Sequence, residues 1–155
     1  MDKRDLEQLL SDVAGGAVTP ADALTRIQTA PTADLGFAQL DLSRGVRQGA
    51  GEVVYGAGKI ADQIAAIIEA LRDAGQERIL VTRLDAEKAA RTAELLGNGI
   101  DLVYVPDAQL ALVGGKPSPT GNGRIVVACA GTSDLPVAEE AALTAEFYGN
   151  EVDRL

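Results

Sequence analysis

The chain has 155 residues, 46% of them hydrophobic and 24% charged, a composition typical of one globular domain or two small ones. Its 23 acidic and 14 basic side chains give a formal net charge of -9, and three Tyr and two Phe are its only aromatic residues. Because an acidic surface repels a phosphate backbone and few rings are present to stack on bases, this composition argues against a nucleic acid partner.

The sequence contains no stretch near the ~18 consecutive apolar residues that cross a membrane. Its first residues, Met1-Asp2-Lys3-Arg4-Asp5, are charged, whereas a secretory signal has an apolar segment after its basic start. We therefore expect a cytoplasmic protein with no membrane partner.

The cysteine and histidine content limits the chemistry further. Cys129 is the only cysteine and histidine is absent, which excludes an intramolecular disulfide, a histidine-containing triad and a histidine-ligated metal. Small apolar neighbours favour Cys129 as an inert, buried cysteine. Acid–base work is left to carboxylates, lysine or tyrosine, and Mg²⁺ held by carboxylates and substrate phosphates is compatible with the composition. The sequence assigns no metal ligands.

Two short amphipathic helices are predicted at the start of the chain. Apolar residues recur at helical spacing over residues 6–13, and Gly15-Gly16 end that pattern. Thr19 suits the N-cap of a second helix, with Pro20 at its first position and Asp22 at the capping-box spacing. The apolar face of this second helix comprises Ala23, Leu24 and Ile27.

Residues 52–105 alternate between strand and helix patterns, which predicts a small α/β layer. One helix carries a broad apolar stripe, and Asp85 suits the N-cap of the next. The stripe comprises Ile60, Ile64, Ile67, Ile68 and Leu71. The expected elements are strand 52–55, helix 60–71, strand 78–83, helix 86–96, strand 100–105 and strand 109–113.

A second domain is predicted to begin after a linker. Residues 114–123 are rich in turn formers, and residues 124–149 show a strand, a polar turn and a helix. We therefore expect an N-terminal α/β domain over residues 1–113 with its helical start at 1–30, a linker, and an incomplete second domain over 124–155. We expect the chain to be a fragment or a truncated reading frame. The apolar strand 125–130 would then pair with the N-terminal sheet or with another chain.

The polar turn at residues 131–134 has the composition of a ligand loop. Gly131 allows close backbone approach, while Thr132, Ser133 and Asp134 lie beside the free N–H groups at a helix start. Such a turn suits phosphate or ribose. Ser133 and Asp134 are also good helix caps, and both roles are compatible.

A second group of candidate residues lies between positions 41 and 59. Arg44 and Arg47 either clamp a diphosphate or form a solvated face, and Asp41 is a candidate metal ligand or water-orienting base. The turn Gly56-Ala57-Gly58-Lys59 either contacts an anion or serves tight strand–helix packing. Tyr55, at a strand end, is a candidate contact or a packing residue.

Two segments resemble the LarB family. The first comprises Phe37-Ala38-Gln39-Leu40-Asp41 with Arg44, Arg47 and residues 52–59, and the second is the segment 130–142, beginning Ala130-Gly131-Thr132-Ser133-Asp134. Both occur in the order that the family has. Ala50-Gly51 depart from the family pattern, which usually has an aromatic or aliphatic residue followed by proline.

The resemblance implies an enzyme of nickel-pincer nucleotide synthesis, which serves lactate racemase. Such an enzyme carboxylates the pyridinium ring of nicotinic acid adenine dinucleotide with carbon dioxide or bicarbonate and hydrolyses the phosphoanhydride to release AMP. The product is pyridinium-3,5-biscarboxylic acid mononucleotide. The second domain is similar to aminoimidazole ribonucleotide carboxylase, which implies a flavodoxin-like fold and a homo-oligomer. Family members continue past Leu155 to a histidine-bearing segment and a nucleophilic cysteine, a role that we do not assign to Cys129.

On this resemblance Asp41 is the catalytic candidate, and the other site residues bind substrate. The substrate-binding candidates are Arg44, Arg47, Tyr55, Gly56, Gly58, Lys59, Gly131, Thr132, Ser133 and Asp134. Two alternatives stay open: a nucleotide-binding or regulatory module that performs no chemistry, and a structural part that supports oligomerisation.

Overall fold

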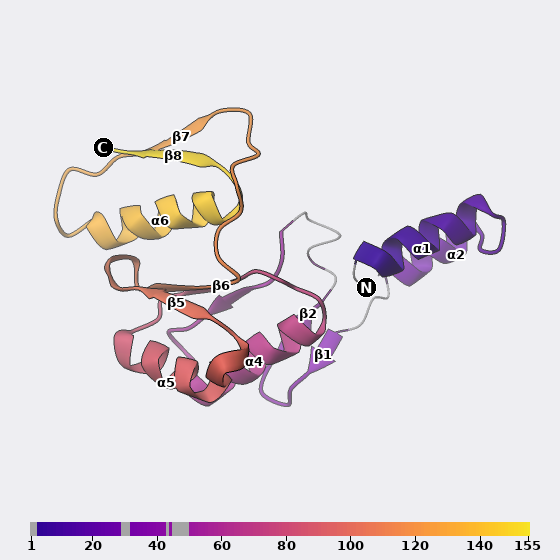
Figure 1. Cartoon of the computed structure of the whole chain (residues 1–155), viewed down its shortest axis with the longest axis horizontal. Helices are drawn as coiled ribbons and strands as arrows, with labels where there is room; N and C mark the ends of the chain where they lie inside the picture. The colour runs from indigo at the N-terminus through magenta and orange to yellow at the C-terminus, as the bar shows by residue number, and fades with distance from the viewer. Residues whose placement is uncertain (1–2, 29–31, 43, 45–49) are drawn as a thin grey trace. The chain divides into compact units, whose positions relative to one another are not determined.

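The computed structural model describes residues 3–28, 32–42, 44 and 50–155 (Figure 1). None of the helices in these ranges is both long and apolar enough to cross a membrane. In chain order the elements are α1 (Lys3–Ala14), α2 (Pro20–Gln28), β1 (Thr32–Asp34), β2 (Gln39–Asp41), β3 (Val53–Tyr55), α4 (Ala61–Asp73), β4 (Ile79–Thr82), α5 (Ala86–Leu96), η1 (Gly97–Gly99), β5 (Leu102–Val105), η2 (Pro106–Ala108), β6 (Leu110–Val113), β7 (Arg124–Val127), α6 (Leu135–Phe147) and β8 (Glu151–Arg154).

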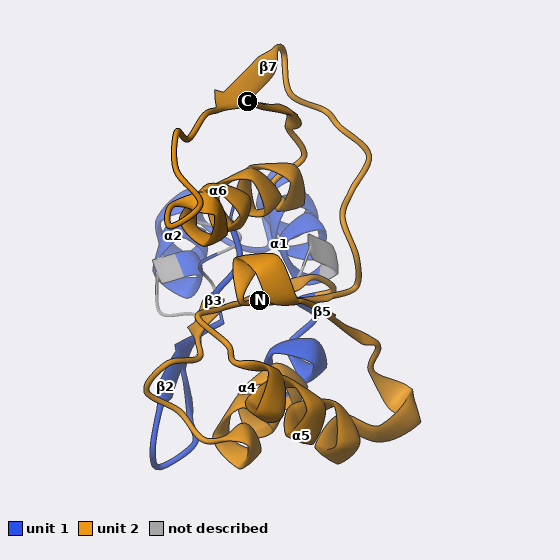
Figure 2. Ribbon diagram, turned by 90° about the vertical axis from the view of Figure 1, so that its left-hand side faces the viewer, with its two compact units in different colours: residues 1–52, 70–76 blue, residues 53–69, 77–155 orange. Residues whose placement is uncertain are grey.

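The chain divides into two compact units, which Figure 2 colours separately. Unit 1 comprises Met1–Glu52 and Ala70–Gln76, and unit 2 comprises Val53–Glu69 and Glu77–Leu155. Helix α4 therefore begins in unit 2 and ends in unit 1. These units group residues by their contacts in space, so they do not test the domain boundaries that the sequence predicts. Those boundaries stay a prediction.

In unit 1 the two predicted helices are confirmed. Thr19 caps α2 as expected: its Oγ1 accepts the N–H of Asp22 at 3.1 Å and donates to the Asp22 carboxylate at 2.8 Å. Ala23 is buried, but Leu24 is 55% exposed, so its assignment to the apolar face was wrong. A hairpin of β1 and β2, which the sequence analysis did not predict, turns at Gly36, whose N–H donates to Asp34 at 2.8 Å.

Unit 1 also holds a side-chain bridge just before β3. The N–H of Glu52 donates to Gln76 Oε1 at 3.0 Å, and Gln76 Nε2 donates back to the Glu52 carbonyl at 2.9 Å. The Gln76 amide thus pairs with the Glu52 backbone in the manner of a neighbouring strand. A Cβ atom at Gly51 would come within 2.7 Å of the Gln76 side chain.

Unit 2 is built on a four-stranded sheet in the order β3-β4-β6-β5. Strands β3 and β4 are parallel, whereas β6 runs antiparallel to both β4 and β5. The central strands β4 and β6 are buried along almost their whole length, as expected for strands that are covered on both faces. The α/β class predicted from the sequence is confirmed.

Helices cover both faces of this sheet, as Figures 1 and 2 show. Helix α6 covers one face, where its Leu143 and Phe147 form a cluster with Leu80, Leu110 and Leu112. Helices α4 and α5 lie on the other face. Each apolar side chain removed from water in such a core stabilises the fold by about 1.5–3 kcal/mol.

The predicted positions of α4 and α5 are confirmed. Ile64, Ile67, Ile68 and Leu71 of α4 are almost completely buried, but Ile60 is 61% exposed because it lies before the first turn of the helix. Asp85 caps α5, and its carboxylate accepts the N–H of Lys88 at 2.8 Å.

The strand–helix unit expected after residue 124 is confirmed, and β8 extends it. Strand β8 pairs parallel to β7, with Ile125 opposite Val152. The prediction that this strand pairs with the N-terminal sheet or another chain was therefore wrong, because the last residues of the chain supply its partner. Val126 is 57% exposed, and Cys129 is only partly buried rather than part of the core.

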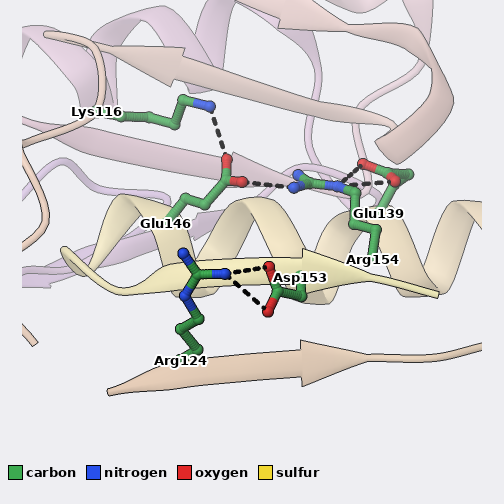
Figure 3. Close-up of polar contacts among 6 residues, drawn as sticks. All are labelled: Lys116, Arg124, Glu139, Glu146, Asp153 and Arg154. Carbon is green, nitrogen blue, oxygen red and sulfur yellow. Dashed lines mark hydrogen bonds and ion pairs between the residues drawn. The ribbon is translucent and has the colours of Figure 1, made fainter. Parts of the chain in front are cut away.

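Ion pairs join the parts of this β7-α6-β8 unit (Figure 3). Arg154 on β8 bonds two carboxylates of α6, Glu139 at 3.0 Å and Glu146 at 2.6 Å. Lys116 bonds the other oxygen of Glu146 at 2.7 Å. Arg124 on β7 bonds Asp153 on β8 at 3.1 Å, which raises its own pKa. The strands are thus fastened to each other and to the helix by charge as well as by backbone hydrogen bonds.

Gly114 gives a test of the connection that follows β6. Its φ is +74°, and a Cβ atom there would overlap the carbonyl oxygen of Glu77. Gly115 has a similar φ of +68° but open space around it. We expect Gly115→Ala to cost about 1–2 kcal/mol for the left-handed backbone alone, and Gly114→Ala to cost about 1–3 kcal/mol more for the overlap. Urea unfolding of both variants measures this difference, and equal losses would contradict the packing described.

The ion pairs of Glu146 predict how the stability of the fold changes in acid. Its hydrogen bond from Arg154, assisted by Lys116, holds its pKa below the ordinary 4.5. A lowered pKa in the folded state adds stability that is present above about pH 4.5 and is lost as the pH falls through the folded value. Because the ion pair is partly solvated, we expect about 1 kcal/mol or less.

The measurement is the urea midpoint between pH 6 and pH 3. We expect it to fall less steeply with acid in Glu146→Gln than in the unaltered chain. Glu94→Gln, which removes an exposed carboxylate paired with Arg91, is the matched control. Identical pH profiles for all three proteins would count against the role given to Glu146.

Candidate functional site

The carboxyl ends of β3 and β4 meet at one edge of the sheet, because the two strands are parallel. The N–H of Gly56 donates to the Thr82 carbonyl at 2.7 Å, which extends the pairing beyond β3. A Cβ atom at Gly56 would lie 3.0 Å from that oxygen and 3.3 Å from the Arg83 carbonyl oxygen. This glycine therefore allows the close approach of two chain segments, the packing alternative considered for it above.

Lys59 lies in the turn between β3 and α4. Its ammonium group donates to the Tyr55 carbonyl at 3.1 Å, which folds the side chain back over the turn. No carboxylate in the described part of the chain forms an ion pair with it. Tyr55 itself is 58% exposed, so its ring is only partly packed.

Lys88 joins the same turn from α5, although the sequence analysis did not select it. Its ammonium group donates to the Gly56 carbonyl at 3.2 Å and lies 3.2 Å from Asp85 Oδ2. The hydrogen bond from the backbone N–H of Lys88, and then the hydrogen bond and charge of its side chain, lower the pKa of Asp85. One signal was present in the sequence: a lysine three residues after a helix cap opposes the helix dipole.

Arg83 and Tyr104 complete the surroundings of this edge. Arg83 has a φ of +54°, and its Nε lies 3.0 Å from Glu140 on α6. The Tyr104 hydroxyl donates to the Leu84 carbonyl at 3.0 Å, and burial, with the nearby Asp85 charge, raises its pKa. Arg83 is thus an anchor between β4 and α6.

The loop of residues 131–134 leads into α6. The N–H of Asp134 donates to the Gly131 carbonyl at 3.0 Å, which closes a turn, and Thr132, Ser133 and Asp134 are exposed. Asp134 occupies the N-cap position, but no side chain makes a capping hydrogen bond there. The hydroxyls and the carboxylate of this loop therefore face solvent and are not used to cap the helix.

This loop lies at the same end of the sheet as the turn of Lys59. Strand β4 is antiparallel to β6, so the carboxyl end of β4 lies beside η2, and Leu84 bonds Gln109 at 2.8 Å there. Helix α6 packs on η2 and on β4. In Figure 1 the loop before α6 lies at this end of the sheet. Two of the predicted ligand segments are thereby placed at one end of unit 2.

The remaining candidates belong to unit 1. Asp41 is the last residue of β2 and is partly buried. Arg44 lies 3.2 Å from Glu52, so a diphosphate would have to compete with that carboxylate for its guanidinium. Arg47 lies outside the described residues.

Neither a metal cluster nor the pocket described below marks a different site among the described residues. The described residues contain no group of three carboxylates or thiols placed to hold a metal ion. A pocket of about 390 Å³ lies at the amino ends of β7 and β8, away from the loop of residues 131–134. Its charged groups Lys116, Glu146, Arg124, Glu151 and Asp153 are already paired with charged neighbours. The carboxyl edge of β3 and β4 is therefore the better candidate.

Glycine-containing turns and basic side chains at the carboxyl ends of parallel strands define a class of α/β proteins that bind small anionic ligands. The comparison with known families makes this more specific. A model of the LarB/PurE-like N-terminal domain matches residues 32–114. The chain therefore belongs to the LarB family, a carboxylase-like family, and the resemblance noted in the sequence is confirmed.

A curated relative is known as well. The uncharacterized protein MJ0165 of Methanocaldococcus jannaschii is 32% identical to this chain over 115 residues. The similarity covers 73% of the chain and 45% of the relative, so the chain spans less than half the length of the protein it matches.

Gly56 and Gly58 give a matched test of the turn. We expect Gly56→Ala to cost about 1 kcal/mol or more, because the added methyl group meets two carbonyl oxygens held by the sheet. Gly58 has open space around it, so Gly58→Ala should change stability by less than about 0.5 kcal/mol. Thermal unfolding of both variants checks this, and a loss confined to Gly58→Ala would show that the turn is described wrongly.

Proposed function

We propose that this chain carries substrate-binding residues of a carboxylase and hydrolase that acts on nicotinic acid adenine dinucleotide. The observation that supports this most directly is the match of residues 32–114 to the LarB/PurE-like N-terminal domain. The matched range includes Asp41, Arg44 and the turn from Tyr55 to Lys59.

The proposed reaction has two parts. In the first, the carbon of carbon dioxide, supplied directly or from bicarbonate, forms a bond to carbon 5 of the pyridinium ring, and the ring loses the proton from that carbon. In the second, water adds across the phosphoanhydride and AMP leaves. The product keeps the ribose, one phosphate and two ring carboxylates.

Each part has candidate residues in this chain. Lys59 and the backbone of the Gly56 turn are proposed to bind a phosphate, and Gly131, Thr132, Ser133 and Asp134 to contact ribose or the ring substituents. Arg44 is proposed to bind the diphosphate by exchange with Glu52, together with Arg47. Asp41 is proposed to orient the attacking water. Mg²⁺ would be bound mainly through substrate phosphates, where it supplies charge neutralisation to the anhydride.

A second candidate function is dinucleotide binding without chemistry. Asp85 accepts the backbone N–H of Lys88 at 2.8 Å and lies 3.2 Å from the ammonium group of the same residue. These two contacts suit Asp85 to cap α5 and to position a cation, which is a binding role. This observation favours binding as the minimum function of unit 2.

The first test is calorimetric titration of the 155-residue chain with nicotinic acid adenine dinucleotide and Mg²⁺. We expect saturable binding that is stronger than that of NAD, whose ring carries an uncharged amide. Arg44→Gln should weaken binding about tenfold, the equivalent of one charge-assisted hydrogen bond. The control is Arg91→Gln, an exposed arginine of α5.

A second assay separates the two candidate functions. Release of AMP, measured by chromatography after incubation with bicarbonate, would support hydrolysis by this chain, whereas binding without AMP would favour the binding module. Absence of binding to either dinucleotide would refute both.

A further inference from the structure

We propose that Lys59 and Lys88 together form a subsite for a diphosphate group, which carries two negative charges in a dinucleotide, at the carboxyl edge of β3 and β4. The inference deepens the proposed function, on which it rests for the identity of the ligand as the diphosphate of a dinucleotide. It adds Lys88 as a binding residue.

The first support is the shared attachment of the two lysines. Lys59 donates to the Tyr55 carbonyl at 3.1 Å and Lys88 to the Gly56 carbonyl at 3.2 Å. These are consecutive residues of one turn, whose Cα atoms are about 3.8 Å apart across a trans peptide. Two ammonium groups that are far apart in the sequence therefore bond adjacent carbonyls of the same turn.

The second support is the balance of charge around the turn. Asp85 is shared by the ammonium and the backbone of Lys88, while Lys59 has no acidic partner among the described residues. Asp62 and Glu87, in the first turns of α4 and α5, are exposed and bond neither lysine. Within the ranges that the structure describes, the two lysines thus have a single carboxylate partner between them, that of Asp85. A bound dianion would offset the repulsion between their charges.

The third support is the orientation of the two helices. Helices α4 and α5, of 13 and 11 residues, both begin at this edge and direct their N-terminal dipoles toward it. A lysine near a helix N-terminus is disfavoured unless an anion compensates, and here both helices carry one. Arg83 is left out of the subsite because Glu140 already neutralises it at 3.0 Å.

The test is titration of the ¹⁵N-labelled 155-residue chain with sodium pyrophosphate at constant ionic strength. We expect saturable shifts of the amide signals of residues 55–60. Lys88→Gln should weaken pyrophosphate binding about tenfold, and Lys88→Arg should largely restore it. Arg91→Gln, on the same helix but paired with Glu94, should leave the affinity within about twofold of the unaltered chain.

Asp85→Asn keeps the proposal testable if Lys88→Gln fails to fold. Asparagine retains a good N-cap but removes the charge that competes for Lys88, so this variant should bind pyrophosphate severalfold more tightly. Unchanged or weaker binding would overturn the subsite. So would equal affinity in Lys88→Gln, or no saturable binding by the unaltered chain.

The same variants separate this inference from the proposed function. If nicotinic acid adenine dinucleotide binds equally to the unaltered chain and to Lys88→Gln, the subsite is refuted while the proposed function stands. If pyrophosphate binds in a Lys88-dependent manner but the dinucleotide does not bind, the subsite stands and the proposed function is refuted. AMP serves as a monophosphate probe, and we expect it to bind more weakly than pyrophosphate because it carries less charge.

Discussion

The parallel pairing of β3 with β4 is the constraint on which the rest of unit 2 depends. It sets Val54 opposite Val81, and the hydrogen bond from Gly56 to Thr82 continues it into the following turn. Because both strands end at the same edge, the helices that follow them also begin there. The positions of Lys59 and Lys88, and the direction of both helix dipoles, are consequences of this one pairing.

The β7-α6-β8 unit uses a different means of stabilisation. The central sheet is held by burial, with Leu80, Leu110 and Leu112 packed under α6. Strand β7 has exposed Ile125 and Val126, and charged pairs connect its Arg124 to β8 and Arg154 of β8 to α6. Surface ion pairs are weak individually and are screened by salt. The stability of β7, α6 and β8 should therefore depend more on ionic strength than the stability of the four-stranded sheet does.

Much of the fold could be predicted from the sequence because its local signals agree. The bounds of α5 were predicted to the residue, since Asp85 caps it and Gly97 follows it. The hairpin of β1 and β2 was missed because Thr32–Asp34 and Gln39–Asp41 are too short and polar to show alternation. Strand β8 was missed for the same reason, which also led to the wrong partner for β7. The exposure of β7 could not be predicted, since its apolar run is typical of a strand covered on both faces.

The candidate site was less predictable than the fold. Lys59 and the turn of Gly131 stood out through local composition, but Lys88 contacts Gly56 across 32 positions. No spacing rule detects such a contact, because it depends on how α5 returns to the sheet. The partner of Arg44, Glu52, was visible in the motif, yet only the structure shows that the two charges meet.

The bridge between Gln76 and Glu52 restricts what position 51 can carry. Any side chain at Gly51 would enter the space of the Gln76 amide. That amide is held by two hydrogen bonds to the Glu52 backbone, so moving it would break both. Positions 51 and 76 are therefore coupled: a side chain fits at the first position only if the residue at the second becomes smaller or turns away. A change of Gly51 is then a joint property of two residues that are distant in the sequence, and both would need to change together.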